Sequence, residues 1–419
     1  MEQVDDYLSN TKANVKLLGL TPLLNPCAAN LSAQRGAMLS AHIPQAQIVH
    51  GCEQPLFFSG FESLIGEYEY NTTERTQGIQ ILEIIPKFIV NSGVYPIRDN
   101  PFYTIVYRGV DDNKVGYFQY EKFTMRSDGF GYENKWLNKS MLNKGNYIDK
   151  NVKLCTSPAH EGNKYMLGTN LNVAYMSLPQ VTEDAFVISE TAYRKICSSH
   201  FGKISFKILP NQIPINLYGN EDEYKFMPDI GEYVRDDGII AALRTPTQDS
   251  IIGDMNRYNL TKVQYLHDTI FHVPPGSKIC DVDIWVNRKC KVKTPREIFS
   301  QVQKYRDPIN AYHLKIMETY QEIQKQGLEI TPAFNTLVYR AISSLLADGV
   351  RIPGYSRKAD VTLMKKKEAI EFIYLTVTYQ TVNDMTRGKK LTGRCGNKGT
   401  NAVVIFPRAV ISGICPSSR

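Results

Sequence analysis

The chain has 419 residues, of which 42% are hydrophobic and 22% are charged, values typical of a globular protein. This length predicts two or three domains or lobes, each with its own core. No apolar run approaches the roughly 18 residues that a membrane-spanning helix needs. The N-terminus is acidic and polar, without the basic start and apolar stretch of a signal peptide. These features exclude a membrane-spanning protein and predict a cytoplasmic one.

The excess positive charge lies in one segment of the chain. The formal net charge is +7, and no Asp or Glu follows Asp384. The cations after that residue account for the whole excess, so residues 1–384 are formally neutral. Cations gathered on one surface attract polyanions and gain free energy from counterion release. The segment therefore indicates a phosphate-bearing partner, with a solvated basic tail as the alternative.

The eight cysteines and seven histidines are dispersed along the chain. None of them has the spacing of a structural zinc site. We interpret the cysteines as reduced thiols, mostly in the core, and expect no zinc in this chain.

The middle of the chain is predicted to be mainly β. A short helix is expected at about 31–41, after a turn that contains several prolines. Runs of β-branched and aromatic residues predict strands between 78 and 107 and again at several shorter places. The shorter runs are NVAYM, DAFVIS, KISFKIL, GIIAAL and DVDIWV.

Apolar residues take helical spacing from 296 to about 346. Pro308 is expected to separate two helices, and a third helix follows from about 334. The run EFIYLTVTYQTV then predicts a strand that leads into the basic, glycine-rich segment.

That segment, RGKKLTGRCGNKGT at 387–400, holds five cations and four glycines and no acidic residue. Glycines at 393, 396 and 399 let the backbone turn tightly and lie against another chain or a sugar-phosphate. Arg394 can bridge phosphate oxygens as a fork, and Lys398 acts as a mobile point charge. The order of Gly and Lys is not that of a Walker A loop. The pattern predicts phosphate binding without sequence readout, and a plain loop with solvated charges is the alternative.

Two other stretches hold candidate site residues. Glu183 and Asp184 stand just before the predicted strand DAFVIS, and neighbouring residues on a strand face opposite ways. A carboxylate beside phosphate implies a divalent cation between them, and a charged turn is the alternative. Arg126 follows an aromatic-rich run and by itself is typical of an ordinary surface arginine.

These stretches occur in the order and approximate spacing found in the β subunit of multisubunit DNA-directed RNA polymerases. NLNVAYMSLPQVTEDAFVISE resembles the family's Asn-Val-x-Val-Ala-Phe-Met-Pro-Trp segment and the Phe-Glu-Asp-Ala-Ile-Val-Ile-Ser-Glu segment after it. GKKLTGRCGNKGT is similar to Gly-Asp-Lys-Met-Ala-Gly-Arg-His-Gly-Asn-Lys-Gly-Val, and YEKFTMRSDG to Lys-Tyr-x-Arg-Ser-Asn-Gln. LTPLLNPCAANLSAQRGAMLSAHIPQAQ resembles the family's Ile-Pro-Phe-Leu followed by Asn-Arg-Ala-Leu-Met-Gly-x-Asn-Met-Gln-Arg-Gln-Ala, with Arg35, Met38, Gln45 and Ala46 in step. The resemblance covers the chain from about Leu17 to Ile405.

The resemblance implies a mixed fold, mainly β with α, built as a double-psi β-barrel of RNA polymerase β type with a flap-like α/β insertion. It divides the chain into four consecutive segments. These are an external, β-rich N-terminal region at 1–114, the first part of the barrel with a hybrid-binding region at 115–245, the flap-like and helical insertion at 246–360, and the second part of the barrel at 361–419.

The resemblance also implies roles for individual residues. Lys390 and Lys398 would act in catalysis, close to the RNA 3′ end and the reactive phosphates. Arg126 and Arg394 would bind nucleotide phosphates, and Asp184, with Glu183, would lie near the second Mg²⁺. The remaining residues are Gly393, Gly396, Asn397 and Gly399, which would shape the loop, and Arg35 and Gln45, which would face nucleic acid.

The function implied is that of a β-like subunit fragment that positions NTP phosphates and the RNA 3′ end for transcription. The chain matches neither the family's N-terminal lobes nor its C-terminal part, and it lacks the Asn-Ala-Asp-Phe-Asp-Gly-Asp motif of the β′ partner. We therefore expect Mg²⁺ to be bound mainly by a β′-like subunit and the chain to be inactive alone. The expected partners are β′-like subunits, other β-like fragments, template DNA, RNA, NTPs and a promoter-specificity subunit.

A free-standing central piece of this kind is most similar to the split β-type subunits of large bacteriophages. This implies the cytoplasm of an infected bacterium, with packaging in the virion as the alternative. Cys395 stands where the family has His, and Lys389 stands where it has Asp. These departures leave open a non-catalytic, polymerase-derived module that binds nucleic acid or serves a structural role. An unrelated phosphate-binding enzyme is a third hypothesis.

Overall fold

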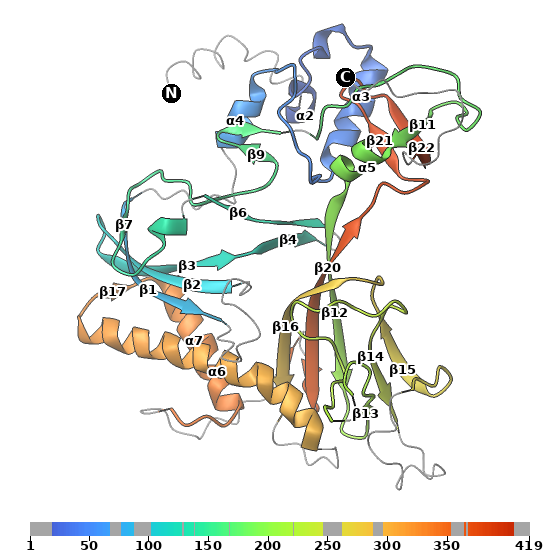
Figure 1. The fold of residues 1–419 in the computed structure, drawn as a ribbon. Coiled ribbons are helices and arrows are strands. Elements are labelled where there is room, and N and C mark those ends of the chain that lie inside the picture. The colour runs from blue at the N-terminus through green and yellow to red at the C-terminus, as the bar shows by residue number, and fades with distance from the viewer. Residues whose placement is uncertain are drawn as a thin grey trace. The chain divides into compact units, whose positions relative to one another are not determined.

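The structure is a computed structural model that describes residues 19–67, 77–87, 102–127, 130–137, 139–166, 168–220, 222–245, 262–287, 296–352, 364–365 and 368–405. Over these ranges the protein is mixed and mainly β, which confirms the predicted class (Figure 1). The sheets formed by the described strands are open, and none of them closes into a barrel. Within the same ranges no helix is both long enough and apolar enough to cross a membrane.

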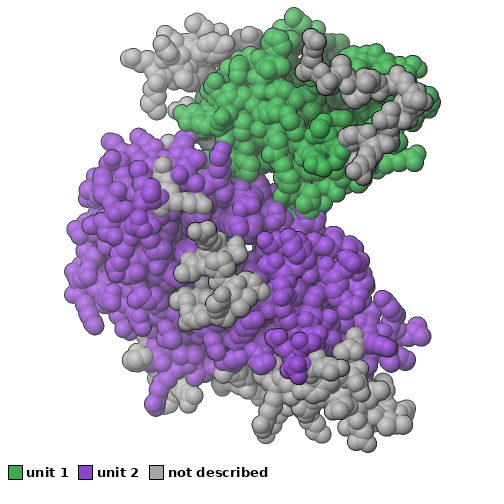
Figure 2. Space-filling view, in the orientation of Figure 1, with its two compact units in different colours: residues 1–72, 155–200, 382–419 green, residues 73–154, 201–381 purple. Residues whose placement is uncertain are grey.

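The chain folds into two compact units that interleave along the sequence (Figure 2). Unit 1 comprises Met1–Thr72, Cys155–His200 and Val382–Arg419, and unit 2 comprises Thr73–Leu154 and Phe201–Thr381. The four predicted segments follow one another along the chain, so they divide it differently. Their assignment to polymerase regions stays a prediction.

Unit 1 is built around a three-stranded sheet with the order β11-β22-β21. β11 runs parallel to β22, and β21 is antiparallel to it. One side of this sheet packs on a small core of Ile188, Ile196 and Met385. The elements of the unit are α2 (Leu20–Leu23), η1 (Ala28–Asn30), α3 (Ala33–His42), η2 (Ile43–Gln45), α4 (Phe61–Glu67), β8 (Cys155–Thr156), β9 (His160–Glu161), β10 (Lys164–Tyr165), β11 (Ala185–Ser189), α5 (Glu190–Ile196), β21 (Lys390–Thr392) and β22 (Lys398–Ile405).

Unit 2 contains a five-stranded sheet with the order β17-β3-β2-β1-β7 and two three-stranded sheets, β12-β20-β16 and β13-β14-β15. The runs predicted as strands supply β1, β2, β12, β14, β16 and β20 of these sheets. Their bounds are β1 (Ile79–Pro86), β2 (Phe102–Gly109), β3 (Lys114–Glu121), β4 (Phe123–Ser127), β5 (Phe130–Glu133), β6 (Lys135–Trp136), η4 (Lys139–Met141), β7 (Tyr147–Ile148), β12 (Ser198–Ile208), β13 (Ile213–Pro214), β14 (Ile239–Arg244), β15 (Asp268–His272), β16 (Lys278–Val286), β17 (Glu329–Ile330), β18 (Met364–Lys365), β19 (Glu368–Ala369) and β20 (Ile373–Asn383).

A single helix of 30 residues, α6 (Arg296–Lys325), runs along unit 2 and has Pro308 in its interior (Figure 1). The prediction that Pro308 separates two helices is therefore wrong. Proline removes one backbone hydrogen bond, but Arg306 and Asn310, on either side of it, both donate to the buried Asp348 carboxylate at 2.8 Å. These tertiary contacts stabilise the helix at the point where Pro308 weakens its backbone hydrogen bonding.

The two halves of α6 contribute to different cores of unit 2. Val302 and Tyr305 pack with β12, β14, β16 and β20. Ile316 and Ile323 pack with the five-stranded sheet and with α7 (Pro332–Ala347). The amphipathic spacing seen in the sequence thus reflects burial against two successive layers.

The run NVAYM at 172–176 was predicted to be a strand, and this prediction is wrong. The run belongs to no strand and pairs with none of the described ones. Val173 is 68% exposed, Tyr175 92% and Met176 56%. β propensity describes how well a residue fits a half-buried, paired surface, and this run has neither a buried face nor a pairing partner within the described part of the chain.

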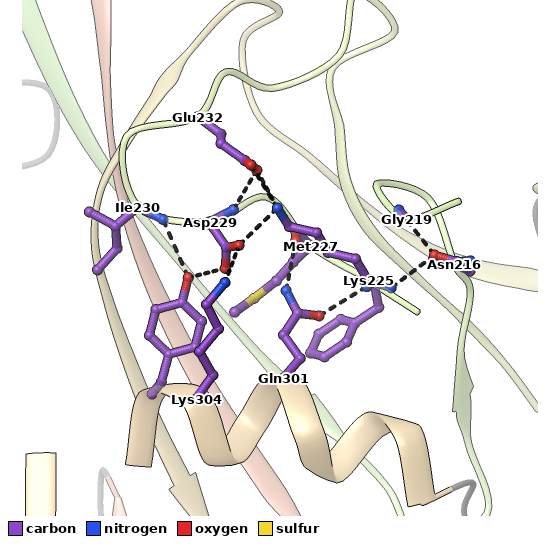
Figure 3. Close-up of polar contacts among 11 residues, drawn as sticks. Asn216, Gly219, Lys225, Met227, Asp229, Ile230, Glu232, Gln301 and Lys304 are labelled. Atoms are coloured by element: carbon purple, nitrogen blue, oxygen red, sulfur yellow. Dashed lines mark hydrogen bonds and ion pairs between the residues drawn. The ribbon is translucent and has the colours of Figure 1, made fainter. Parts of the chain in front are cut away.

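A buried carboxylate fixes the loop before β14 onto α6 (Figure 3). Asp229 accepts hydrogen bonds from Lys304 at 2.8 Å and from the Tyr305 hydroxyl, and it forms an ion pair with Lys225 at 2.8 Å. Burial alone would raise the pKa of Asp229, but the hydrogen bonds from Lys225, Lys304 and Tyr305 outweigh it and lower the pKa. The ionised form of Asp229 therefore stabilises this unit.

We expect Asp229→Asn to lower the free energy of unfolding at pH 7 by about 3 kcal/mol, because it leaves the mostly buried Lys225 without one of its two carboxylate partners. Because the native pKa is depressed, the stabilisation is complete above the unfolded pKa of about 3.9 and is lost as the pH falls through the native value. The difference between variant and wild type should thus shrink on acidification. Urea unfolding from pH 7 down to pH 3 measures it.

Asp307→Asn, at an exposed position of the same helix, is the matched control and should change stability by less than about 0.5 kcal/mol. An equal loss at every pH for Asp229→Asn would contradict the ionised role of Asp229.

Candidate functional site

The ribbon formed by β21 and β22 carries both predicted catalytic lysines. Its register pairs Lys390 with Thr400 and Thr392 with Lys398. Cross-strand partners and residues two apart on one strand point to the same face of a sheet. All four side chains are exposed, whereas Leu391 packs against the core of unit 1. The ribbon therefore has one cationic, polar face and one apolar face.

Lys390 and Lys398 are diagonal neighbours on this face, because Lys398 lies two residues before the partner of Lys390. Diagonal neighbours in an antiparallel pair are about 7–8 Å apart. Each ammonium group sits on a flexible four-carbon stem. Both can therefore reach one polyphosphate or two neighbouring phosphates of a nucleic-acid backbone.

The loop between the two strands is held in a tight turn by its glycines. Gly393 donates its N–H to the carbonyl of Asn397 at 3.0 Å, and Gly396 donates to Gly393 at 3.3 Å. Gly396 has a φ of +73°, and a Cβ there would lie 2.6 Å from the Arg35 carbonyl oxygen. A residue with a side chain would thus be strained in conformation and would collide with α3. The close approach predicted for these glycines is made to other parts of the same chain.

Three side chains from the first part of unit 1 fasten this ribbon and its loop. Asn25 donates to the Arg394 carbonyl at 2.7 Å, and Arg35 donates from Nη1 to the Gly396 carbonyl at 3.2 Å. His42 Nδ1 lies 3.1 Å from the Thr392 hydroxyl. Arg35, predicted to face nucleic acid, is exposed and also supports the loop. Gln45, with the same predicted role, is exposed at the end of η2.

Arg394, predicted to bind nucleotide phosphates, is turned towards acceptors within the protein. Its Nη2 donates to the Phe57 carbonyl at 2.8 Å, and its Nη1 lies 3.8 Å from the Glu62 carboxylate. The side chain of Arg394 is 24% exposed and that of Glu62 is 2% exposed. A phosphate would have to compete with both of these groups for the guanidinium.

The predicted carboxylates lie beside the ribbon. Asp184 directly precedes β11, whose first residue, Ala185, is in register with Thr400. A Cβ on Gly399 would lie 2.4 Å from the Asp184 carbonyl oxygen, so the two main chains are in contact and Gly399 is required there. Glu183 has a φ of +55°, which is uncommon for a residue with a side chain and places it in a turn. Both carboxylates are exposed.

The structure thus brings Asp184, Lys390 and Lys398 onto neighbouring main-chain segments of unit 1. Arg126 belongs to β4 in unit 2, and its side chain lies outside the described part of the structure. The convergence of Arg126 with the other three residues therefore stays a prediction. Among the described residues, no group of three or more His, Cys, Asp or Glu could hold a metal ion.

Sequence reasoning missed the residues that hold the loop in place. Glu62 stands in Ser59-Gly60-Phe61-Glu62, a Ser-x-x-Glu pattern typical of a helix start, which could have drawn attention to it. Asn25 and His42 carry no local signal, because their partners lie near the other end of the chain.

Comparison with known proteins adds no assignment to this geometry. No protein-family model and no curated protein matches the sequence. The interpretation of the site therefore rests on the register, exposure and contacts of its own residues.

We expect Gly396→Ala to lower the free energy of unfolding of unit 1 by about 2–3 kcal/mol, because the variant combines left-handed strain with a collision against α3. Gly388→Ala is the matched control, since Gly388 has a similar φ of +88° but open space around it, and it should cost about 1 kcal/mol. Chemical unfolding monitored by a probe in unit 1 compares the two. Equal losses would show that contact with α3 does not restrain the loop.

Proposed function

We propose that the chain is a β-like subunit of a DNA-directed RNA polymerase that positions the triphosphate of the incoming nucleotide and the RNA 3′ end. The observation that carries this proposal is the ribbon face on which Lys390 and Lys398 stand together, beside the main chain of Asp184. The sequence resemblance described above supports it, because the same residues fill the matching motif positions.

The chemistry of phosphoryl transfer suits such a face. Catalysis of this reaction depends on positioning and on neutralising charge, and it needs no nucleophilic side chain. Lys390 and Lys398 would hold phosphate oxygens, and the hydroxyl of Thr400 adds a hydrogen-bond donor on the same face. Water can reach the face in the isolated chain, because all four side chains are exposed.

Asp184 and Glu183 fit a magnesium ion that shares its coordination with phosphates. Mg²⁺ is commonly held by one or two carboxylates together with phosphate oxygens. When bound, the ion would neutralise charge on the transferring group. This chain would contribute the exposed Asp184, with Glu183 as its neighbour, and a β′-like partner would supply the other carboxylates.

The proposal also covers the architecture. β11, β21 and β22 would form part of a double-psi β-barrel, and the region from 246 to 360 would be a flap-like insertion. Its support is the parallel pairing of β11 with β22, which joins two strands that are far apart in the sequence. Other β-like fragments would complete the barrel.

The partners follow from the same proposal. They are β′-like subunits, further β-like fragments, template DNA, RNA, NTPs and a promoter-specificity subunit, in the cytoplasm of an infected bacterial cell. Phosphate contacts position nucleic acid but do not read its sequence. Promoter choice would therefore lie with another subunit.

One observation favours a second candidate, a polymerase-derived module that binds nucleic acid without catalysis. The guanidinium of Arg394 is engaged by Phe57 and Glu62, so one predicted phosphate ligand is already occupied. Such a module would keep the cationic face and lose the reaction.

The deciding experiment uses the complex that co-purifies with the tagged full-length chain. We expect Lys398→Ala to leave the complex assembled and to reduce the rate of RNA elongation at least 100-fold, the loss typical of removing one preorganised donor. Lys389→Ala is the matched control, because Lys389 is exposed nearby and donates to Asn383 at 2.9 Å. Its elongation rate should stay within threefold of the wild type.

Full elongation by the Lys398→Ala complex would favour the non-catalytic module. Hydrolysis of nucleoside triphosphates by the isolated chain would instead favour an unrelated phosphate-binding enzyme.

The isolated chain provides a separate test of the cationic face. Each neutralised phosphate of a single strand contributes about 0.7 to the slope of log K against log salt concentration. We expect Lys390→Ala/Lys398→Ala to reduce that slope by about 1.4 for a labelled single-stranded RNA, because two phosphate contacts are lost. Fluorescence anisotropy at several salt concentrations measures it. An unchanged slope would place RNA binding elsewhere.

A further inference from the structure

Glu62 lies at the start of α4 and closes that helix end. Its carboxylate accepts hydrogen bonds from the N–H groups of Ser59 at 3.1 Å and Gly60 at 2.9 Å. In return, the Ser59 hydroxyl accepts from the N–H of Phe61 at 3.3 Å. This reciprocal arrangement is a variant of the capping box, and on its own it explains why a Glu stands at this position.

Because Glu62 is buried, its carboxylate also needs a countercharge. A capping glutamate is usually solvated, but the side chain of Glu62 is only 2% exposed. A buried carboxylate is costly unless a countercharge and hydrogen bonds compensate it. The cation that faces it is Arg394, whose Nη1 is 3.8 Å from Oε1 of Glu62. The helix start and the cationic loop therefore meet through these two charges.

Arg394 transmits this contact to the loop. Nη2 of the same guanidinium donates to the Phe57 carbonyl at 2.8 Å, so one hydrogen bond and the longer ion pair with Glu62 hold its charged end. The main chain of Arg394 is held at a third point, because its carbonyl accepts from Asn25 at 2.7 Å. Lys398 follows Arg394 by four residues and begins β22, so the place of Arg394 helps to set where the ribbon face starts.

We propose that Glu62 is a positioning residue: it anchors Arg394, and through Arg394 it fixes the loop that sets the spacing of Lys390 and Lys398. Arg394 serves in this arrangement as the anchor of the loop and is not a phosphate ligand. The catalytic consequence rests on the proposed polymerase function, whereas the anchoring itself does not.

The anchoring is tested by amide hydrogen exchange in the full chain. Glu62→Gln keeps the size of the side chain and an acceptor for the Ser59 N–H but removes the charge. We expect the amides of Gly393 and Gly396 to exchange at least tenfold faster, because both donate to carbonyls within the loop. The amides of α4 and β11 should keep their wild-type rates.

Two further variants separate anchoring from loss of the fold. Glu62→Gln/Arg394→Gln leaves no unpaired charge, so the unit should fold, yet the loop amides should still exchange fast. Glu190→Gln is the matched control, because Glu190 pairs with the exposed Arg194 in the same unit and should leave the loop unchanged. The proposal would be overturned if the amides of Gly393 and Gly396 exchanged at wild-type rates in Glu62→Gln, or if their protection were restored in the double variant.

The consequence for binding is read with the same labelled single-stranded RNA. We expect Glu62→Gln to weaken binding three- to tenfold with an unchanged salt slope, because both lysines remain but are less well placed. A merely structural role of Glu62 in α4 would leave the affinity as it is and would refute the positioning role. If wild-type complexes do not elongate RNA, the polymerase proposal fails, and the exchange rates still decide the role of Glu62.

Discussion

The register of the β21–β22 ladder determines which side chains of this ribbon face outward. Lys390 faces outward only because it pairs with Thr400, and Lys398 only because it pairs with Thr392. A slip of β21 by one residue against β22 would turn Lys390 towards the apolar core and expose Leu391, so the two lysines would no longer share a face. The burial of Leu391 with Ile188 and Met385 opposes that slip. The same small core that stabilises unit 1 therefore orients its charges.

Much of this arrangement could be predicted from the sequence, because it depends on local pattern. The β-branched and aromatic runs predict β11 in unit 1 and β1, β2, β12, β14, β16 and β20 in unit 2, and the glycines at 393 and 396 predict the tight loop. β21 and β22 are not among the strands that these runs predict. The alternation of Lys390, Leu391 and Thr392 also indicates one polar and one apolar face. The strands next to the two candidate segments, β11 and β22, pair in one sheet.

Other features could not be predicted, because distant residues decide them. Pro308 is tolerated in α6 because Arg306 and Asn310 both bind Asp348, which lies beyond the next helix. NVAYM has the composition of a strand but finds no partner among the described strands. The guanidinium of Arg394 is directed by Glu62 and Phe57, from the opposite part of the sequence. Local propensity cannot predict such contacts, because it reflects only the secondary structure that residues close together in the sequence prefer.

The interleaving of the two units has a consequence for how the protein is made. Unit 1 draws α2, α3 and α4 from the first stretch of the chain, β11 and α5 from the middle, and the ribbon from the last stretch. The ribosome synthesises α3 and α4 long before β22, so both helices are made while the sheet of unit 1 is still incomplete. Contacts between such distant segments form slowly and expose apolar surface in the meantime. The cationic face therefore cannot form until β22 has been made, long after α3, α4 and β11.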